Sequence, residues 1–188
     1  MPMNGVSSYS VSDLDNNLNV TDTSITISGS DINKRGRIYK NIKLSDYTND
    51  RIKLVYKFDF NMSKCDKGQG GVTWGNQSDV TRDSGMKFAG LFFGTNPRVT
   101  LGNSNGDGVE ISNFNLNQKY TVELTWDLTN KLLQAKLIDN NNNLQGSGSI
   151  TMPSINYDYF YAFQQRNGGA SYPGVLSGVF SNFRWSFS

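Results

Sequence analysis

The stretch that decides the fold runs from residue 120 to residue 139 and reads YTVELTWDLTNKLLQAKLID. The apolar positions of its first half recur at every second residue: Tyr120, Val122, Leu124 and Trp126. A period of two predicts a strand with one buried face. The polar ends of residues 127–130 suit a tight reversal, and a second apolar run follows over residues 131–138. The stretch therefore predicts a β-hairpin.

The same pattern extends outward from this hairpin. Residues 51–60 alternate with period two, and residues 144–152 predict a third strand beside the hairpin, which makes a meander. Further strands are predicted at residues 24–28, 36–44, 157–165 and 179–187. The 19 glycines fall with Asn, Ser and Asp at roughly ten-residue intervals, the turn rhythm of a sandwich or barrel. The sequence predicts an all-β protein.

Composition excludes several classes of chemistry. The chain has 188 residues, 36% hydrophobic and 18% charged, with 23 Asn and only two Glu. Without His, and with Cys65 as the single cysteine, it has no His-based triad, His metal site or internal disulfide. Two lysines near Cys65 would lower its pKa, but no general base is available to make it a nucleophile.

Charge and length predict a single domain without nucleic acid as a partner. A net charge of +2 provides no basic surface for phosphates, and the apolar run at residues 88–93 is too short for membrane insertion. We expect residues 1–10 to be frayed and residues 11–188 to form one β-sandwich domain. No signal peptide is visible, and we nevertheless expect an extracellular or cell-surface location as part of a secreted protein.

Three stretches, read in order, resemble the concanavalin A-like lectin/glucanase jelly roll, and in particular a carbohydrate-binding module. They are SITISGSDINKRGRIYKNIKL at residues 24–44, the central hairpin, and SGVFSNFRWSFS at residues 177–188, which resembles the family's closing strand. The resemblance implies a two-sheet antiparallel β-sandwich with one concave sheet, in which the closing strand pairs beside the first. Members of this family include lectins, binding modules, glycosidases and lyases, so the fold does not select a function.

Catalytic residues of the family are poorly matched. Glycosidases need two closely spaced carboxyl groups, and Glu110 and Glu123 are thirteen residues apart. The lyases of this fold use Tyr, Gln, Arg and commonly His around a sugar carboxylate. The segment YFYAFQQRN at residues 159–167 supplies Tyr, Gln and Arg but no His. Hydrolase or lyase activity is therefore the weaker alternative, and we expect no enzyme.

Aromatic and amide side chains offer a sugar site, because a pyranose ring packs on an aromatic face and its hydroxyls bond uncharged amides. In residues 157–165, Tyr159, Tyr161 and Gln165 would line the concave face if Phe160 and Ala162 point into the sandwich. The opposite orientation would bury the tyrosines instead. Both orientations are compatible with the alternation.

Two polar, glycine-rich loops supply the remaining candidates. The loop at residues 69–85 contains Trp74 as an aromatic anchor, with Asn76, Gln77 and Arg82 around it. Alternatively, residues 72–74 form a short strand and Trp74 fills the core. The loop at residues 167–174, with Arg166 and Tyr172, would rim the same groove.

One segment has the beginning of a calcium loop. Asn103, Asn105 and Asp107 place oxygen donors at every second position before Gly108, but the twelfth position is Phe114 instead of Glu. The same residues suit a hairpin turn. A weak structural Ca²⁺ site therefore remains the alternative to a turn, and no cofactor is required.

Taken together, these features predict non-catalytic binding of a polysaccharide or glycan through an aromatic and amide-lined concave face. The chain would be a module of a larger protein or assembly. A structural or receptor-binding domain of a virion or cell-surface fibre is the alternative, which an exposed apolar patch would favour.

Overall fold

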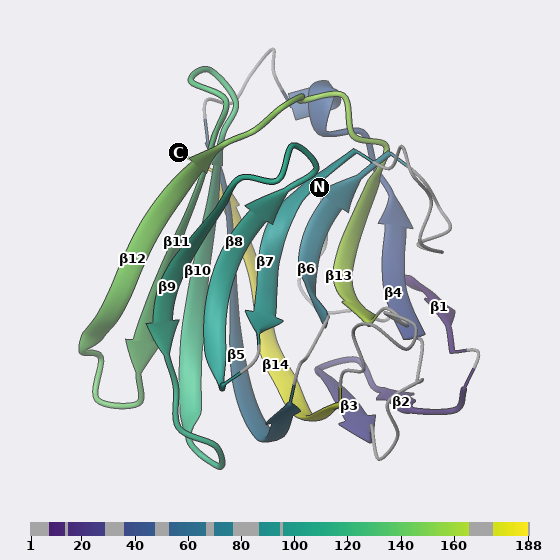
Figure 1. Cartoon of the computed structure of the whole chain (residues 1–188). Helices are drawn as coiled ribbons and strands as arrows, with labels where there is room; N and C mark the ends of the chain where they lie inside the picture. Colours follow the sequence, from purple (N-terminus) through teal and green to yellow (C-terminus); the bar gives the residue numbers. More distant parts are fainter. Residues whose placement is uncertain are drawn as a thin grey trace.

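A computed structural model of the chain describes residues 8–13, 15–28, 36–47, 53–66, 70–76, 87–94, 96–165 and 175–187. These residues form two stacked antiparallel sheets (Figure 1). The elements are β1 (Ser10–Ser12), β2 (Leu18–Val20), β3 (Ser24–Ser28), β4 (Gly36–Asn41), the 3-10 helix η1 (Leu44–Tyr47), β5 (Lys53–Asp66), β6 (Gly70–Gly75), β7 (Phe88–Gly94), β8 (Arg98–Asn103), β9 (Gly108–Asn113), β10 (Lys119–Asp127), β11 (Leu132–Asp139), β12 (Leu144–Thr151), β13 (Tyr159–Gln165) and β14 (Val175–Phe187).

Each sheet has seven strands. Sheet A has the order β1-β4-β13-β6-β7-β8-β9 and faces the viewer in Figure 1, and sheet B has the order β12-β11-β10-β5-β14-β3-β2. The predicted meander is confirmed, because β10, β11 and β12 are consecutive neighbours. The closing strand β14 lies between β5 and β3, so it pairs beside the first predicted strand. The predicted fold class, an all-β two-sheet sandwich, is confirmed.

The core fills the space between the sheets. The four apolar positions that predicted β10 are all buried, as are their partners on β5. Its largest side chains form one aromatic cluster that includes Tyr56, Trp126 and Phe160. Burial of each such side chain contributes roughly 1.5–3 kcal/mol, and this burial holds the two sheets face to face.

The sandwich closes on one side where the edge strands β9 and β12 meet. A Cβ atom at Gly146 of β12 would lie 2.1 Å from the backbone oxygen of Ile111 on β9. Glycine is therefore required there for the two backbones to approach.

The N-terminal region differs from the expectation of a frayed segment up to residue 10. Residues 1–7 lie outside the described residues, but Tyr9 is buried, with its ring 6.2 Å from that of Phe160. Ser10 begins β1, which pairs with β4. The sandwich therefore includes residues before Val11. In the described part of the chain, no helix is long and apolar enough to cross a membrane.

Candidate functional site

The outer face of sheet A, turned away from sheet B, carries the candidate site. Antiparallel pairing aligns side chains of successive strands in lines that cross this face. One line follows the register Tyr39, Tyr161, Thr73, Gly90 and Gly102. The next line follows the register Arg37, Gln164, Gly71, Phe92 and Thr100.

Three tyrosines, Tyr39, Tyr159 and Tyr161, form what we call the tyrosine cluster. The ring of Tyr39 lies 6.1 Å from that of Tyr159 and 6.0 Å from that of Tyr161. Tyr39 and Tyr159 are half-buried, whereas Tyr161 is fully buried although it lies outside the core between the sheets. The guanidinium carbon of Arg37 lies 5.3 Å from the centre of the Tyr39 ring, within the range of a cation–π contact.

A buried polar pair lies beside the tyrosine cluster. Gln164 Nε2 donates a hydrogen bond to Thr73 Oγ1 at 2.7 Å, and the exposed fractions of the two residues are 1% and 0%. Gln164 Oε1 is buried and finds no donor among the residues that the structure describes. Thr73 and Gln164 therefore place an amide oxygen with unused acceptor capacity beneath the outer face of sheet A.

A β-bulge explains why Gln164 faces outward. The register of β13 shifts between Tyr161 and Phe163 against β4, and between Tyr161 and Gln164 against β6. Phe160 and Ala162 point into the core as one predicted orientation required, and the shift brings Phe163 into the core as well. With Phe160 and Ala162 inward, simple alternation would also turn Gln164 inward, but the bulge inserts one extra residue and turns Gln164 outward.

A second aromatic group lies on β7. The rings of Phe88 and Phe92 are 5.6 Å apart at 78°, an edge-to-face contact, and both residues are half-buried. Gly90 lies between them, where a Cβ atom would be 2.2 Å from Thr73 Cγ2. Phe88 and Phe92 therefore lie on a part of the outer face where Gly90 allows β7 to pack closely against Thr73 of β6.

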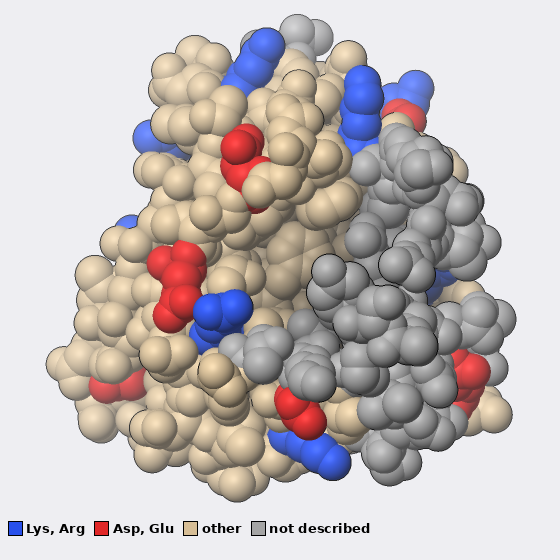
Figure 2. Space-filling view, in the orientation of Figure 1, with Lys and Arg blue, Asp and Glu red and all other residues tan. Residues whose placement is uncertain are grey.

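Where Figure 2 shows described residues, the outer face of sheet A is mostly uncharged over β7 and is hollowed there. Toward the β9 edge, Arg98 and Glu110 form an exposed ion pair at 3.0 Å. A surface of aromatic rings and amides with few free charges suits a neutral polar ligand.

Trp74 is not a surface anchor. It belongs to β6, is fully buried and points between the sheets, with its ring 5.3 Å from that of Phe160 and 6.4 Å from that of Trp126. The prediction that Trp74 binds sugar from a loop is wrong, and the alternative, a core tryptophan on a short strand, is confirmed. Its polar sequence neighbours did not reveal that the opposite sheet covers it.

The remaining predicted site residues have different outcomes. Asn76 Oδ1 accepts the backbone N–H of Lys87 at 2.9 Å, so this side chain joins the two ends of the loop. Four predicted residues lie outside the described residues and remain predictions: Gln77, Arg82, Arg166 and Tyr172. Gln165 ends β13, and its side chain also lies outside what is described.

Four outward-facing residues were missed by the sequence analysis: Tyr39, Phe88, Phe92 and Gln164. Tyr39 had a readable signal, since it is adjacent to buried Ile38 in a predicted strand and alternation therefore turns it outward. The two phenylalanines lie in a run of apolar residues with no alternation of polarity. Such a run does not show which face is buried.

The predicted calcium loop is a hairpin turn between β8 and β9. Asn103 Oδ1 accepts the backbone N–H groups of Asn105 and Asp107 at 2.9 and 3.2 Å, and Asn103 Nδ2 donates to Asp107 Oδ2 at 2.8 Å. The turn interpretation is confirmed. Among the described residues, no group of three or more His, Cys, Asp or Glu side chains gathers around one point. A weak Ca²⁺ site here remains a prediction.

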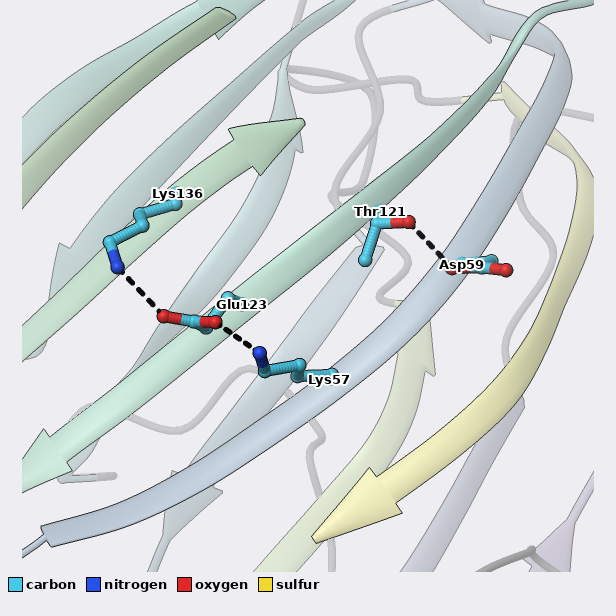
Figure 3. A network of polar contacts seen from close by, with 5 residues as sticks. All are labelled: Lys57, Asp59, Thr121, Glu123 and Lys136. Carbon is cyan, nitrogen blue, oxygen red and sulfur yellow. Dashed lines mark hydrogen bonds and ion pairs between the residues drawn. The ribbon is translucent and has the colours of Figure 1, made fainter. Parts of the chain in front are cut away.

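The two glutamates are far from a catalytic arrangement. Glu110 lies on β9 of sheet A and Glu123 on β10 of sheet B. Glu123 accepts from Lys136 at 2.9 Å and also pairs with Lys57 (Figure 3). Burial alone would raise the pKa of Glu123, but the two lysines outweigh burial and lower it. A carboxylate held in its charged form does not act as a proton donor.

Cys65 is a structural residue. Burial raises the pKa of the Cys65 thiol to about 12, and the neighbouring Asp66 charge adds to this effect. Its Sγ donates to the backbone oxygen of Gly94 at 3.3 Å. A thiol with a raised pKa stays protonated at neutral pH and is a poor nucleophile.

A second hollow, of 280 Å³, lies on the outer face of sheet B. It is lined by Glu123, Thr125, Gln134, Ala135, Lys136, Ser147, Gly148 and Ser149. No aromatic ring lines it, and its two charged side chains pair with each other. For these reasons the outer face of sheet A is the better candidate for a binding site.

Comparison with known proteins supports the fold. No protein-family model and no curated protein sequence matches the chain. Among solved structures, basic winged bean lectin with Tn-antigen has a TM-score of 0.66 at 12% identity, covering 98% of this chain and 95% of that one. A Lotus tetragonolobus seed lectin also has a TM-score of 0.66 at 12% identity, covering 99% and 98%.

Two other similar structures have different descriptions. A protein of unknown function from Saccharomyces cerevisiae has a TM-score of 0.65 at 10% identity, covering 98% of both chains. Trypanosoma rangeli sialidase has a TM-score of 0.57 at 14% identity, and the match spans 94% of this chain but 27% of the sialidase. The chain thus has the concanavalin A-like jelly-roll fold of the legume lectins. At these identities the likeness establishes the fold alone.

Proposed function

We propose that the protein binds a polysaccharide or glycan, without catalysis, through the outer face of sheet A. The observation that carries the proposal is the tyrosine cluster beside the buried Gln164–Thr73 pair. Aromatic faces pack against the C–H face of a sugar ring, and amide and hydroxyl groups bond its hydroxyls. Both kinds of group occur together on this face.

The charges of the molecule support a non-catalytic role. Glu110 and Glu123 point away from each other's sheet, and each is paired with a basic side chain. Among closely spaced aspartates, Asp13 lies two residues before Asp15 and accepts the backbone N–H groups of Asn17 and Leu18. Asp79 and Asp83 lie outside the described residues. A role as a binding module of a secreted or cell-surface protein accords with this arrangement.

Affinity electrophoresis and calorimetry against a panel of plant and microbial polysaccharides test the proposal. We expect at least one polysaccharide to retard the protein and to bind with micromolar to millimolar affinity, and Tyr39→Ala to weaken that binding. Unsaturated products or new reducing ends would show a lyase or hydrolase. A large oligomer without any sugar binding would favour the structural domain of a virion or cell-surface fibre.

A further inference from the structure

Gln164 occupies an unusual position for a buried amide. Its backbone pairs with Arg37 on β4 and Gly71 on β6, so its side chain lies at the middle of the outer face of sheet A. One end of the amide is fixed, because Nε2 donates to Thr73 Oγ1 at 2.7 Å. This bond directs Oε1 away from Thr73, and Oε1 has no donor among the described residues.

A buried carbonyl oxygen without a donor is uncommon, because buried polar groups are nearly always hydrogen-bonded. Gln164 has 1% of its surface exposed, so Oε1 is shielded from bulk water, and a ligand reaches it only by displacing the groups that cover it. The acceptor is also located beside the aromatic rings that would pack against a sugar. A sugar hydroxyl that donates to Oε1 would complete the hydrogen bonding of the amide.

We infer that Gln164 is a specificity-determining residue of the carbohydrate site, where its Oε1 accepts a hydrogen bond from a hydroxyl of a neutral sugar. This inference rests on the proposed function and adds the substrate class: neutral, hydroxyl-bearing sugars in preference to uronates. The tyrosine cluster holds the ring of the sugar, and Gln164 discriminates between the groups attached to that ring.

The chemistry of the acceptor gives this preference. An ionised carboxylate has only acceptors, so a uronate placed at Gln164 would bring two acceptors together without a proton between them. Such a pair in a buried place leaves both groups unsatisfied. Arg37 pairs with Gln164 across β4 and β13, and its guanidinium carbon lies 5.3 Å from the centre of the Tyr39 ring. A ligand group placed at Oε1 of Gln164 faces a carbonyl oxygen, which accepts a hydrogen bond and does not donate one.

Two variants separate the role of Gln164 in binding from a role in packing. Gln164→Met keeps the shape of the side chain and removes Oε1. Thr73→Ser keeps the hydroxyl that anchors Nε2 and therefore leaves Oε1 in place, and it is the matched control. Gln164→Glu keeps an acceptor oxygen and adds charge, and it serves as the second test if Gln164→Met does not fold.

The experiment measures affinity for neutral chains (xyloglucan, galactomannan and laminarin) and for uronate chains (polygalacturonate and alginate). We expect the unaltered protein to bind a neutral chain roughly tenfold more tightly than either uronate chain. Gln164→Met should weaken binding of the neutral chain by roughly tenfold and leave binding of the uronate chains unchanged, so that the preference disappears. Affinity of Thr73→Ser for the neutral chain should stay within about threefold of the unaltered protein, and Gln164→Glu should sharpen the preference for the neutral chain.

The possible results distinguish this inference from the proposed function. If no polysaccharide binds the unaltered protein, the proposed function fails. If a chain binds and Tyr39→Ala weakens it, but Gln164→Met has no effect, the proposed function stands and the role of Gln164 is wrong. A preference for uronates, or an equal loss in Thr73→Ser and Gln164→Met, would also overturn that role.

Discussion

The rings of Tyr39 and Tyr161 lie 6.0 Å apart at paired positions of β4 and β13, on the side of sheet A away from the core. Tyr39 is half-buried, whereas Tyr161 is fully buried. Tyr39 therefore presents ring surface that a ligand can cover, and Tyr161 holds it in place. The first prediction therefore concerns Tyr39.

Tyr39→Ala should weaken sugar binding by about 1–3 kcal/mol, as expected when an aromatic anchor of an interface is truncated. Tyr39→Phe keeps the ring and should retain most of the affinity. Calorimetric titration with a polysaccharide that binds the unaltered protein measures both. Equal affinity of Tyr39→Ala and the unaltered protein, with both folded, would remove the tyrosine cluster from the site.

Trp74→Ala should act on folding. The indole is fully buried and contacts rings from both sheets, including Phe160 on β13 and Trp185 on β14. Its removal leaves a cavity between the sheets, so we expect a loss of about 3–5 kcal/mol in the free energy of unfolding. Urea unfolding measures the loss. A variant as stable as the unaltered protein would contradict the placement of Trp74 in the core.

The sequence predicted the strands wherever one face is apolar and the other polar. In β10 the alternation of Tyr120 to Trp126 identified the buried face correctly, and the same held for β5 from Leu54 to Phe60. Alternation is informative in these strands because the outer face of sheet B is solvated and charged. The polarity of each side chain then reports its direction.

The candidate site was less predictable because sheet A carries apolar groups on both faces. Phe88 and Phe92 point outward while Leu91 and Phe93 point into the core, so polarity does not distinguish them. The bulge in β13 reverses the alternation after Tyr161, and no local residue type marks it. Tertiary pairing decides both features, and a single sequence does not contain that pairing explicitly.

Asn103→Ala should destabilise the hairpin between β8 and β9. The Asn103 side chain accepts two backbone N–H groups in the turn and donates to Asp107 and to the backbone oxygen of Thr151 on β12. Loss of these bonds should lower the free energy of unfolding by about 1–3 kcal/mol.

Calcium should have little effect on the same turn, because Asn103 Oδ1 already accepts two N–H groups. We expect the thermal unfolding midpoint to be the same in EDTA and in millimolar Ca²⁺. A rise in the midpoint with Ca²⁺ that disappears in Asp107→Asn would instead establish the weak calcium site.

The surroundings of the Asp59 carboxyl group lead us to expect that stability depends on pH. Burial would raise the pKa of its carboxyl group, but hydrogen bonds from Lys119, Asn182 and Thr121 outweigh burial and lower it. Thr121 Oγ1 donates to Oδ1 at 2.7 Å, and Asn182 Nδ2 donates to Oδ2 at 2.6 Å. The left-handed backbone of Asn182, with φ of 55°, accompanies a bulge in β14 that brings its amide to Asp59.

Because the folded pKa of Asp59 lies below the unfolded value, the carboxylate stabilises the fold above the unfolded pKa of about 4. This contribution is lost as the pH falls through the folded pKa. Asp59→Asn replaces one carboxylate oxygen, an acceptor, with an NH₂ group that faces hydrogen-bond donors. We therefore expect the free energy of unfolding to fall by about 1–3 kcal/mol at pH 7. The difference between Asp59→Asn and the unaltered protein should shrink below about pH 4. Urea unfolding across this pH range measures it.

Glu110→Gln is the matched control for the same measurement. Its partner Arg98 is 41% exposed and Glu110 is 47% exposed, so solvent screens the ion pair. Exposed pairs contribute about 0–1 kcal/mol, and we expect Glu110→Gln to change stability by less than about 1 kcal/mol at neutral pH. A loss in Asp59→Asn that is no larger than in Glu110→Gln, or that persists unchanged at low pH, would contradict the stabilising role of the Asp59 carboxylate. The contrast follows from burial. The side chain of Asp59 is only 6% exposed, so little water is available to bond to its hydrogen-bond donors when the carboxylate is lost.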